Sequence, residues 1–132
     1  MPVEGVVHAL RNIHGALAAD GILVDTQPVS PSPQLASDGS ELGSLDMREW
    51  VDTIHAVDER IAETFAAGMY ELEHESSFIV TDTFDDGSEC LDIVSGWRGT
   101  HLPLGVSQQL VAATSRVSVQ QEVRLRLLRR AP

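Results

Sequence analysis

The last part of the chain alternates apolar and polar side chains over about a dozen residues. The apolar positions are Val117, Val119, Val123, Leu125 and Leu127, and the polar positions are Ser118, Gln120, Glu122, Arg124 and Arg126. A period of two is typical of a β-strand with one buried face and one wet or polar-packed face. A helix would spread the arginines around all its sides. The segment is therefore predicted to be a strand, with Gln121 as the exception on its apolar side.

The length and composition limit what this strand can belong to. A chain of 132 residues corresponds to one domain, and its apolar share of 42% is ordinary for a globular protein. No apolar run is long enough to span a membrane, and no signal peptide opens the chain. We therefore expect a cytoplasmic protein that does not bind membranes. The single cysteine, Cys90, excludes an internal disulfide and a four-thiolate zinc site.

Charge is distributed unevenly along the chain. The net charge is −11, and all nine basic residues are arginines. Residues 93–132 hold six of these arginines and a single acid, Glu122. A basic end can bind nucleic acid, but no aromatic side chains for base stacking lie between these arginines. We therefore expect no nucleic-acid partner, and we predict that the basic end packs beside acidic helices of the same or a neighbouring chain.

Patterning predicts an α/β protein with a small mixed sheet of about three strands. The long helix is predicted to open at Asp46, whose carboxylate forms a capping-box-like pair with Glu49, and to keep its period as far as Leu72. Proline, serine and glycine dominate residues 29–44, which we expect to be a mobile loop. The other predicted elements are a helix over 3–19, a buried strand over 22–26, a strand over 78–84, a short helix over 106–113, and the final strand. Residues 88–97 are ambiguous: they fit a short helix capped by Asp86 or Ser88 better than the return strand of a hairpin.

Residues 10–24 resemble one stretch of class I SAM-dependent methyltransferases, in which a helix ending in Leu-x-Pro-Gly-Gly leads into the fifth strand of the sheet. Here Ala19-Asp20-Gly21 stands in place of Pro-Gly-Gly. The remaining order is also similar: a long helix, a strand ending at Phe84-Asp85-Asp86, a short helix with Trp97, and a final strand that ends in arginines. The resemblance implies that residues 1–132 form a single half domain like the C-terminal half of a Rossmann-like methyltransferase fold.

The SAM-binding half of that family has no counterpart here. The family holds SAM over a glycine-rich turn after its first strand, and this chain has no Gly-x-Gly-x-Gly after any predicted strand. No cofactor-binding residue carries over, and no catalytic residue is assigned. The resemblance therefore implies a methyltransferase-like protein that is not catalytic alone and binds SAM only if a partner supplies the missing half.

Four interpretations remain open at this point. The chain is a dimerisation or partner-completing module, or it is the substrate-side half of a methyltransferase that another chain completes. The third interpretation is a small-ligand binding protein that uses residues 28–44 as a lid. The fourth is that the chain is a gene-model fragment, with Met1 as an internal methionine.

The predicted strand over 22–26 carries a further expectation. In the family it pairs with a strand that is missing here, so Ile22, Leu23 and Val24 would lie at an unpaired apolar edge. Natural proteins rarely leave such an edge open. We therefore predict that a second copy or a partner chain covers it.

Other residues with site chemistry have simpler explanations. The histidines are His8, His14, His55, His74 and His101, and the acidic run comprises Asp82, Asp85, Asp86, Glu89 and Asp92. Neither set has the spacing of a metal site, so no metal is predicted. Cys90 lacks a neighbour that would activate it and is expected to be a small buried residue. Trp50 and Trp97 are expected to be core or interface anchors.

Overall fold

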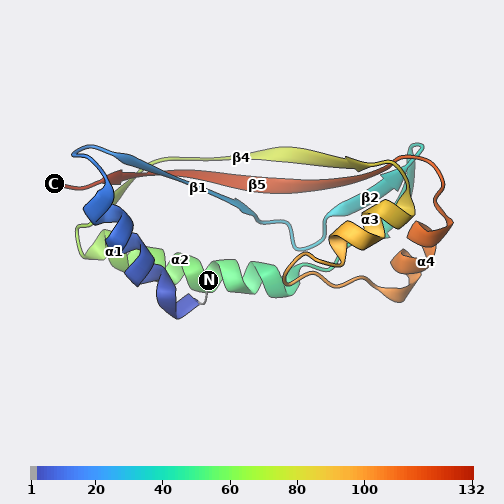
Figure 1. The fold of residues 1–132 in the computed structure, drawn as a ribbon, viewed down its shortest axis with the longest axis horizontal. Coiled ribbons are helices and arrows are strands. Elements are labelled where there is room, and N and C mark those ends of the chain that lie inside the picture. Colours follow the sequence, from blue (N-terminus) through green and yellow to red (C-terminus); the bar gives the residue numbers. More distant parts are fainter. Residues whose placement is uncertain (1–2) are drawn as a thin grey trace. The chain divides into compact units, whose positions relative to one another are not determined.

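The computed structural model describes residues 3–132 and is a mixed α/β structure (Figure 1). Within these residues it contains a short 3-10 turn, four α-helices and five β-strands. The elements are η1 (Val3–Gly5), α1 (Val6–Ala16), β1 (Ile22–Pro28), β2 (Gln34–Ser37), β3 (Ser40–Ser44), α2 (Arg48–Ala66), β4 (Tyr70–Phe84), α3 (Gly87–Val94), α4 (Leu104–Ala112) and β5 (Val117–Arg130). None of these helices is long and apolar enough to cross a membrane.

The final strand, β5, organises the sheet. The strand order is β1-β5-β2-β3, and β4 also pairs with β5. The β2–β3 and β2–β5 pairs are antiparallel, with Leu35 opposite Val119. Next to β1, the Arg130 amide donates to the Gly21 carbonyl. The prediction of a mixed sheet of about three strands is therefore wrong in strand number and direction, because the sheet has five strands and is antiparallel.

The two additional strands lie in the segment predicted to be a loop. β2 and β3 form a hairpin whose turn residues, Asp38 and Gly39, have φ angles of 50° and 75°. This Asp-Gly pair supplies the left-handed backbone that a two-residue hairpin turn requires. Pro33 and Leu35 are fully buried, so the segment has apolar anchors despite its polar composition. The loop prediction for residues 29–44 is therefore wrong where β2 and β3 lie.

The long helix ends earlier than its apolar period predicted. α2 stops at Ala66, and Gly68 follows with a φ of 72°. The Met69 amide donates to the Thr64 carbonyl, and the Gly68 amide donates to the Phe65 carbonyl. This pair of bonds is the Schellman pattern that closes a helix with a left-handed glycine. The chain then enters β4 at Tyr70, where the apolar period predicts a continuing helix.

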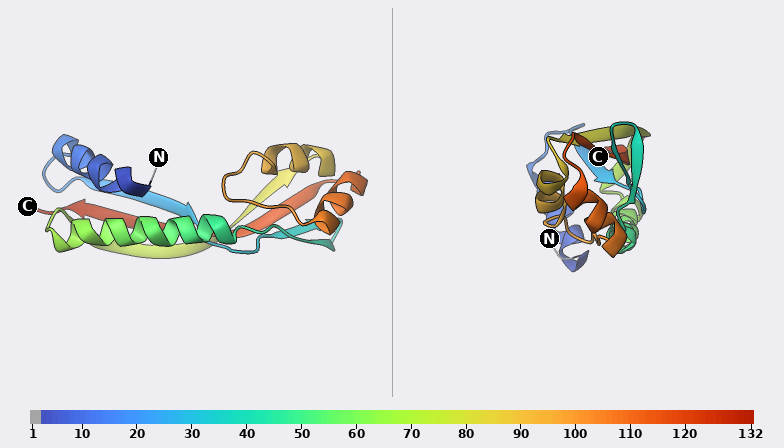
Figure 2. Two further views of the ribbon diagram at one scale, coloured as in Figure 1. Left: turned by 90° about the horizontal axis from the view of Figure 1, so that it is seen from below. Right: turned by 90° about the vertical axis from the view of Figure 1, so that its right-hand side faces the viewer.

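The chain divides into two compact units. Unit 1 contains the chain up to Gln27, Asp52–Ser77 and Arg124–Pro132, and unit 2 contains Pro28–Val51 and Phe78–Val123. In unit 1, α1 and α2 lie on the same face of the strands, as the view from below shows (Figure 2, left). In unit 2, α3 packs on α4, and α4 packs on β3.

Each unit has its own hydrophobic core. The core of unit 1 is built on Leu10, Ile61, Tyr70 and Leu128. The core of unit 2 is built on Leu35, Leu45, Met47, Phe84, Cys90, Val94, Val106, Leu110, Val117 and Val119. Strand β5 thus supplies Val117 and Val119 to the core of unit 2 and Leu128 to the core of unit 1. The alternation predicted that the odd-numbered apolar residues of β5 are buried. This is confirmed in unit 2 for Val117 and Val119, whereas in unit 1 Leu125 and Leu127 are only half-buried.

In unit 1, Arg124 and Arg126 of β5 are largely covered and are paired with carboxylates. The side chains of Arg124 and Arg126 are only 14% and 16% exposed. Arg124 donates two hydrogen bonds to the Asp58 carboxylate of α2, at 2.7 and 2.8 Å, and these bonds raise the pKa of Arg124. Arg126 donates to Glu75 of β4 at 3.2 Å. The prediction that the basic end packs beside acidic helices is thus confirmed for Asp58 on α2 of the same chain, whereas Glu75 lies on a strand.

Candidate functional site

The strongest candidate site is a cavity in unit 2. It encloses about 420 Å³, a volume within the range of small-molecule pockets. Its lining residues are Pro28, Met47, Trp50, Gly96, Trp97, Arg98 and Gln121. They come from the end of β1, the start of α2, the segment after α3, and the middle of β5. Two tryptophans, an arginine and a glutamine thus line one open cavity.

Trp50 is held in the wall of this cavity by two hydrogen bonds. Its indole Nε1 donates to the Pro28 carbonyl at 3.0 Å, and its backbone amide donates to the Gly99 carbonyl at 3.3 Å. Gly99 has a φ of 66°, and a Cβ at this position would lie 2.8 Å from the Trp50 amide nitrogen. Only glycine accommodates both the left-handed backbone and this approach. Trp50 is therefore positioned by backbone groups on two sides.

The second indole belongs to the turn that ends α3. The Gly96 amide donates to the Ile93 carbonyl, and the Trp97 amide donates to the Val94 carbonyl, which tightens the chain after the helix. Trp97 is half-buried against the core of unit 2. Both tryptophans are thus core anchors, as the sequence predicted. They also line the cavity, and no pattern in the sequence indicated this second role.

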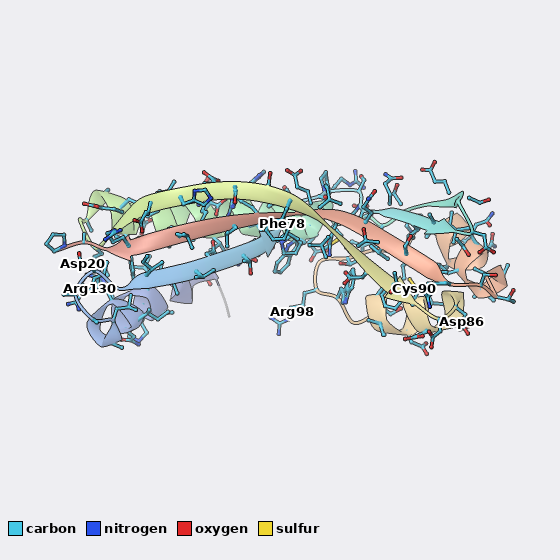
Figure 3. The ribbon with its side chains drawn as sticks, turned by 90° about the horizontal axis from the view of Figure 1, so that it is seen from above. Asp20, Phe78, Asp86, Cys90, Arg98 and Arg130 are labelled. Carbon is cyan, nitrogen blue, oxygen red and sulfur yellow. The ribbon has the colours of Figure 1, made fainter. Side chains whose placement is uncertain are left out.

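Arg98 is the charged group of this site. It is exposed, and its side chain projects away from the ribbon (Figure 3). Within residues 3–132, no carboxylate lies within ion-pair distance of its guanidinium, whereas Arg124, Arg126 and Arg129 of β5 are paired. A guanidinium presents donors in a planar fork that suits carboxylate, sulfonate or phosphate oxygens. Arg98 is therefore available at the cavity to bind an anion.

Gln121 supplies the amide of the site. Its Oε1 atom is buried and has no hydrogen-bond donor among the described residues. The adjacent residue is firmly tied: the Glu122 amide donates to Ser30 Oγ at 2.7 Å, and the Glu122 carbonyl accepts from the Val29 amide at 3.0 Å. Buried acceptors without a donor are uncommon in proteins. Because this oxygen is inaccessible even to water, it faces the protein interior, and a ligand in the cavity does not reach it.

A short bridge fixes the segment that precedes α2. The Asp46 amide donates to the His101 carbonyl at 2.9 Å, and the His101 amide donates back to the Asp46 carbonyl at 2.7 Å. The Asp46 carboxylate accepts from the side chain and the backbone amide of Arg48, which lowers the pKa of Asp46 from 3.8 to about 2. The helix thus starts two residues after the predicted position, with Asp46 still capping its first turn.

We expect Asp46→Asn to destabilise the protein near neutral pH and to have less effect in acid. The pKa of Asp46 in the folded protein, about 2, lies below its ordinary value of 3.8. The charged form therefore contributes stability above about pH 4, and this contribution disappears as the pH falls toward 2. Urea unfolding at pH 7, 4 and 2 measures the difference between the variant and the parent. A difference that stays constant down to pH 2 would contradict the assignment.

The other residues with site chemistry have structural roles. The Asp86 side chain caps α3 by accepting from the Glu89 amide, and Glu89 accepts from the Asp85 amide. His101 contacts Glu49 at 2.6 Å, and His14 packs edge-on against Tyr70. Among residues 3–132, no three histidine, cysteine or acidic side chains are placed to hold a metal ion.

Cys90 behaves as the sequence predicted. It is fully buried in the core of unit 2, and burial raises the pKa of its thiol to about 11. The thiol therefore serves packing and is not a nucleophile of the cavity.

No protein-family model and no curated protein matches the chain.

Proposed function

We propose that unit 2 is a binding module for a small planar organic molecule, which occupies the cavity between Trp50 and Trp97. The observation that carries this proposal is the convergence of two indoles on a cavity of about 420 Å³. Ligand pockets are mostly apolar, with few polar groups that fix orientation. Trp50 and Trp97 supply apolar contact, and Arg98 is the charged residue of the lining. This set of lining residues favours binding over catalysis, because it contains no pair of acid and base groups.

The dye 8-anilinonaphthalene-1-sulfonate tests this proposal, because it is planar and fits such a volume. We expect saturable binding to the full chain, followed by the increase in dye fluorescence. Replacing Trp97 by alanine is expected to weaken binding about tenfold, the loss of about 1.4 kcal/mol that a missing aromatic contact produces. Leu104→Ala is the matched control, because Leu104 is a 76% exposed apolar residue of unit 2 outside the cavity.

Circular dichroism checks that each variant is folded, and Trp97→Leu replaces Trp97→Ala if the alanine variant is not. Equal dye affinity of the parent, the Trp97 variant and the Leu104 variant would refute the proposal. In that case the dye binds elsewhere, and the cavity is not a ligand site.

A second proposal concerns unit 1 and retains the interpretation from sequence. We propose that a second copy of the chain pairs with β1. We also propose that the chain is a methyltransferase-like module without catalytic activity of its own. The support for the pairing is that β1 pairs only with β5 among the described strands. Ile22 and Val24 on this strand are 43% and 58% exposed. Such an apolar edge is a template for further strand pairing.

Sedimentation velocity over a range of concentrations tests the pairing. We expect the parent to associate, and we expect Val24→Lys to remain monomeric. Val111→Lys is the control, because Val111 is an equally exposed valine of α4, at 64%. A parent that is monomeric at every concentration would refute self-association.

Calorimetric titration with SAM tests the methyltransferase-like interpretation: we expect no binding to the isolated chain, and micromolar binding would overturn it.

A further inference from the structure

We infer that two copies of the chain join through β1 in an antiparallel register, with the two-fold axis of the dimer at Val24. This inference rests on the proposed self-association and deepens it, because it states which residues of the two copies pair. The backbone hydrogen bonds around β1 carry it, together with the order of apolar and charged side chains along this strand. Both copies would use the same surface, as two-fold dimers do.

Two hydrogen bonds determine how β1 lies against β5. The Arg130 amide donates to the Gly21 carbonyl at 2.8 Å, and the Val29 amide donates to the Glu122 carbonyl at 3.0 Å. Both bonds fit one antiparallel register, with Gly21 opposite Arg130 and Val29 opposite Glu122. In such a register, every second residue turns both of its backbone groups toward the neighbouring strand. The odd-numbered residues of β1 therefore bond to β5.

The even-numbered residues of β1 turn their backbone groups away from β5. These residues are Ile22, Val24, Thr26 and Pro28, and the Pro28 carbonyl accepts from the Trp50 indole instead of from a strand. β1 is the last strand in the order β1-β5-β2-β3, and in Figure 3 it runs in blue along the margin of the sheet. No described strand lies beyond it. The first three residues thus present unpaired donors and acceptors at this edge.

These three free positions are symmetric about Val24. If a second copy lies antiparallel with the axis at Val24, the two Val24 residues exchange backbone hydrogen bonds. Ile22 then exchanges them with Thr26 of the second copy, so that all three outward-facing residues are paired. The side chains of these residues are exposed in the single chain, and all three are β-branched. Pairs of β-branched side chains across neighbouring strands are favourable.

The alternative antiparallel registers are less favourable. An axis at Asp25 would place two carboxylates of like charge opposite each other and would set Ile22 against Pro28, which has no N–H. An axis at Leu23 would leave the outward groups of Thr26 beyond the partner strand, which begins at Ile22. Each copy has a net charge of −11, so the contact is most favourable where no like charges meet.

A single cysteine at the axis tests this register in the full chain. In Val24→Cys, the two Cα atoms would lie about 5.5 Å apart, which is within the range of a disulfide. We expect a disulfide-linked dimer after mild oxidation with oxidised glutathione, as measured by non-reducing gel electrophoresis. The native Cys90 is fully buried and is not expected to react. Val111→Cys is the control, because Val111 is 64% exposed on α4, away from β1.

Mixtures of two variants distinguish this register from the others. Ile22→Cys and Thr26→Cys are expected to cross-link with each other. Each alone is expected to link no more than Val111→Cys, because its two thiols would lie four residues, or about 13 Å, apart along the strands. Cross-linking of Ile22→Cys with Val24→Cys instead would indicate an axis at Leu23 and would overturn the inference. Equal cross-linking of every single variant with itself would indicate parallel strands, with the same consequence.

Thr26→Pro tests the backbone contact without a change of charge. It removes an N–H that turns away from β5, so each copy is expected to fold, whereas self-association is expected to weaken about tenfold or more. Gln27→Pro is the control, since it removes an N–H that turns toward β5 and is expected to destabilise the single chain. Circular dichroism checks folding, and Ile22→Pro replaces Thr26→Pro if the latter is unfolded. Unchanged self-association in a folded proline variant would contradict the inference.

The outcomes separate this inference from the self-association on which it rests. If sedimentation shows the parent as a monomer at every concentration, self-association itself fails. If the parent associates and Val24→Lys prevents it, but Val24→Cys cross-links no more than Val111→Cys, the copies pair through β1 in another register. Only the inference is then overturned. Association that persists in Val24→Lys would show that the copies meet at another surface, which overturns both.

Discussion

Replacing Asp58 by alanine is expected to lower the free energy of unfolding by about 3 kcal/mol, because the change leaves two largely covered cations without their main acceptor. Arg124 donates both of its terminal nitrogens to the Asp58 carboxylate, and Arg126 contacts the same carboxylate at 3.4 Å. Both arginine side chains are less than one fifth exposed. Glu75 is 43% exposed and replaces only part of the lost interaction.

Urea unfolding, followed by far-ultraviolet circular dichroism, measures this loss. The control is Glu63→Ala, which breaks an ion pair with Arg60 on the exposed face of α2. Exposed pairs contribute at most about 1 kcal/mol, so the control is expected to change little. Equal stabilities of the two variants would show that the Asp58 cluster contributes no more than a surface pair does.

Gly87→Ala is expected to lower the free energy of unfolding by about 3 kcal/mol or more, because the added methyl group would clash with the backbone of α4. A Cβ at Gly87 would lie 1.7 Å from the Leu110 carbonyl oxygen and 2.6 Å from its carbonyl carbon. The atoms in the way are backbone, so no side-chain rotation relieves the clash. Helix α3 would have to move away from α4, and overpacked cores are destabilised by about 1–3 kcal/mol even where side chains can adjust.

Thermal and urea unfolding measure this effect, and the chain offers a matched control. Gly15 lies near the end of α1, and a methyl group at this position would meet nothing within 4 Å. Gly15→Ala is expected to stabilise the helix by about 0.5–1 kcal/mol, since alanine has the higher helix propensity. If Gly87→Ala is as stable as the parent, α3 and α4 do not approach as closely as described.

The fold was predictable where local signals were strong. The alternation of residues 117–127 correctly predicted β5, and the apolar spacing of Leu91 and Val94 favoured the short helix that the structure shows as α3. The helix α2 was predicted in place, but its end was not. Met69 and Leu72 continue the helical period beyond Gly68, so periodicity alone could not show that the left-handed glycine ends the helix.

The hairpin shows how composition can hide a local signal. Asp38-Gly39 is a hairpin dipeptide in sequence, and it forms that turn in the structure. The prolines and serines around it favoured a loop assignment. What could not be read locally is the pairing of β2 with β5, because it joins Leu35 to Val119 across most of the chain.

The candidate site was the least predictable part. Trp50, Trp97 and Gln121 come from separate segments, and only tertiary folding brings them to one cavity. One signal was present in the sequence: Gln121 interrupts the apolar side of an alternating strand. A polar residue at such a position indicates a pocket wall as readily as it indicates a packing exception.

The division of the chain has a consequence for spectroscopy. The protein has two tryptophans and one tyrosine; both tryptophans belong to unit 2, and Tyr70 belongs to unit 1. Tyr70 is almost fully buried, its hydroxyl donates to the Leu10 carbonyl at 2.6 Å, and burial raises its pKa. Tryptophan emission therefore reports on one unit, and the ultraviolet absorbance change on phenol ionisation reports on the other. Comparing the two signals during unfolding shows, without any attached label, whether unit 1 and unit 2 unfold together or one after the other.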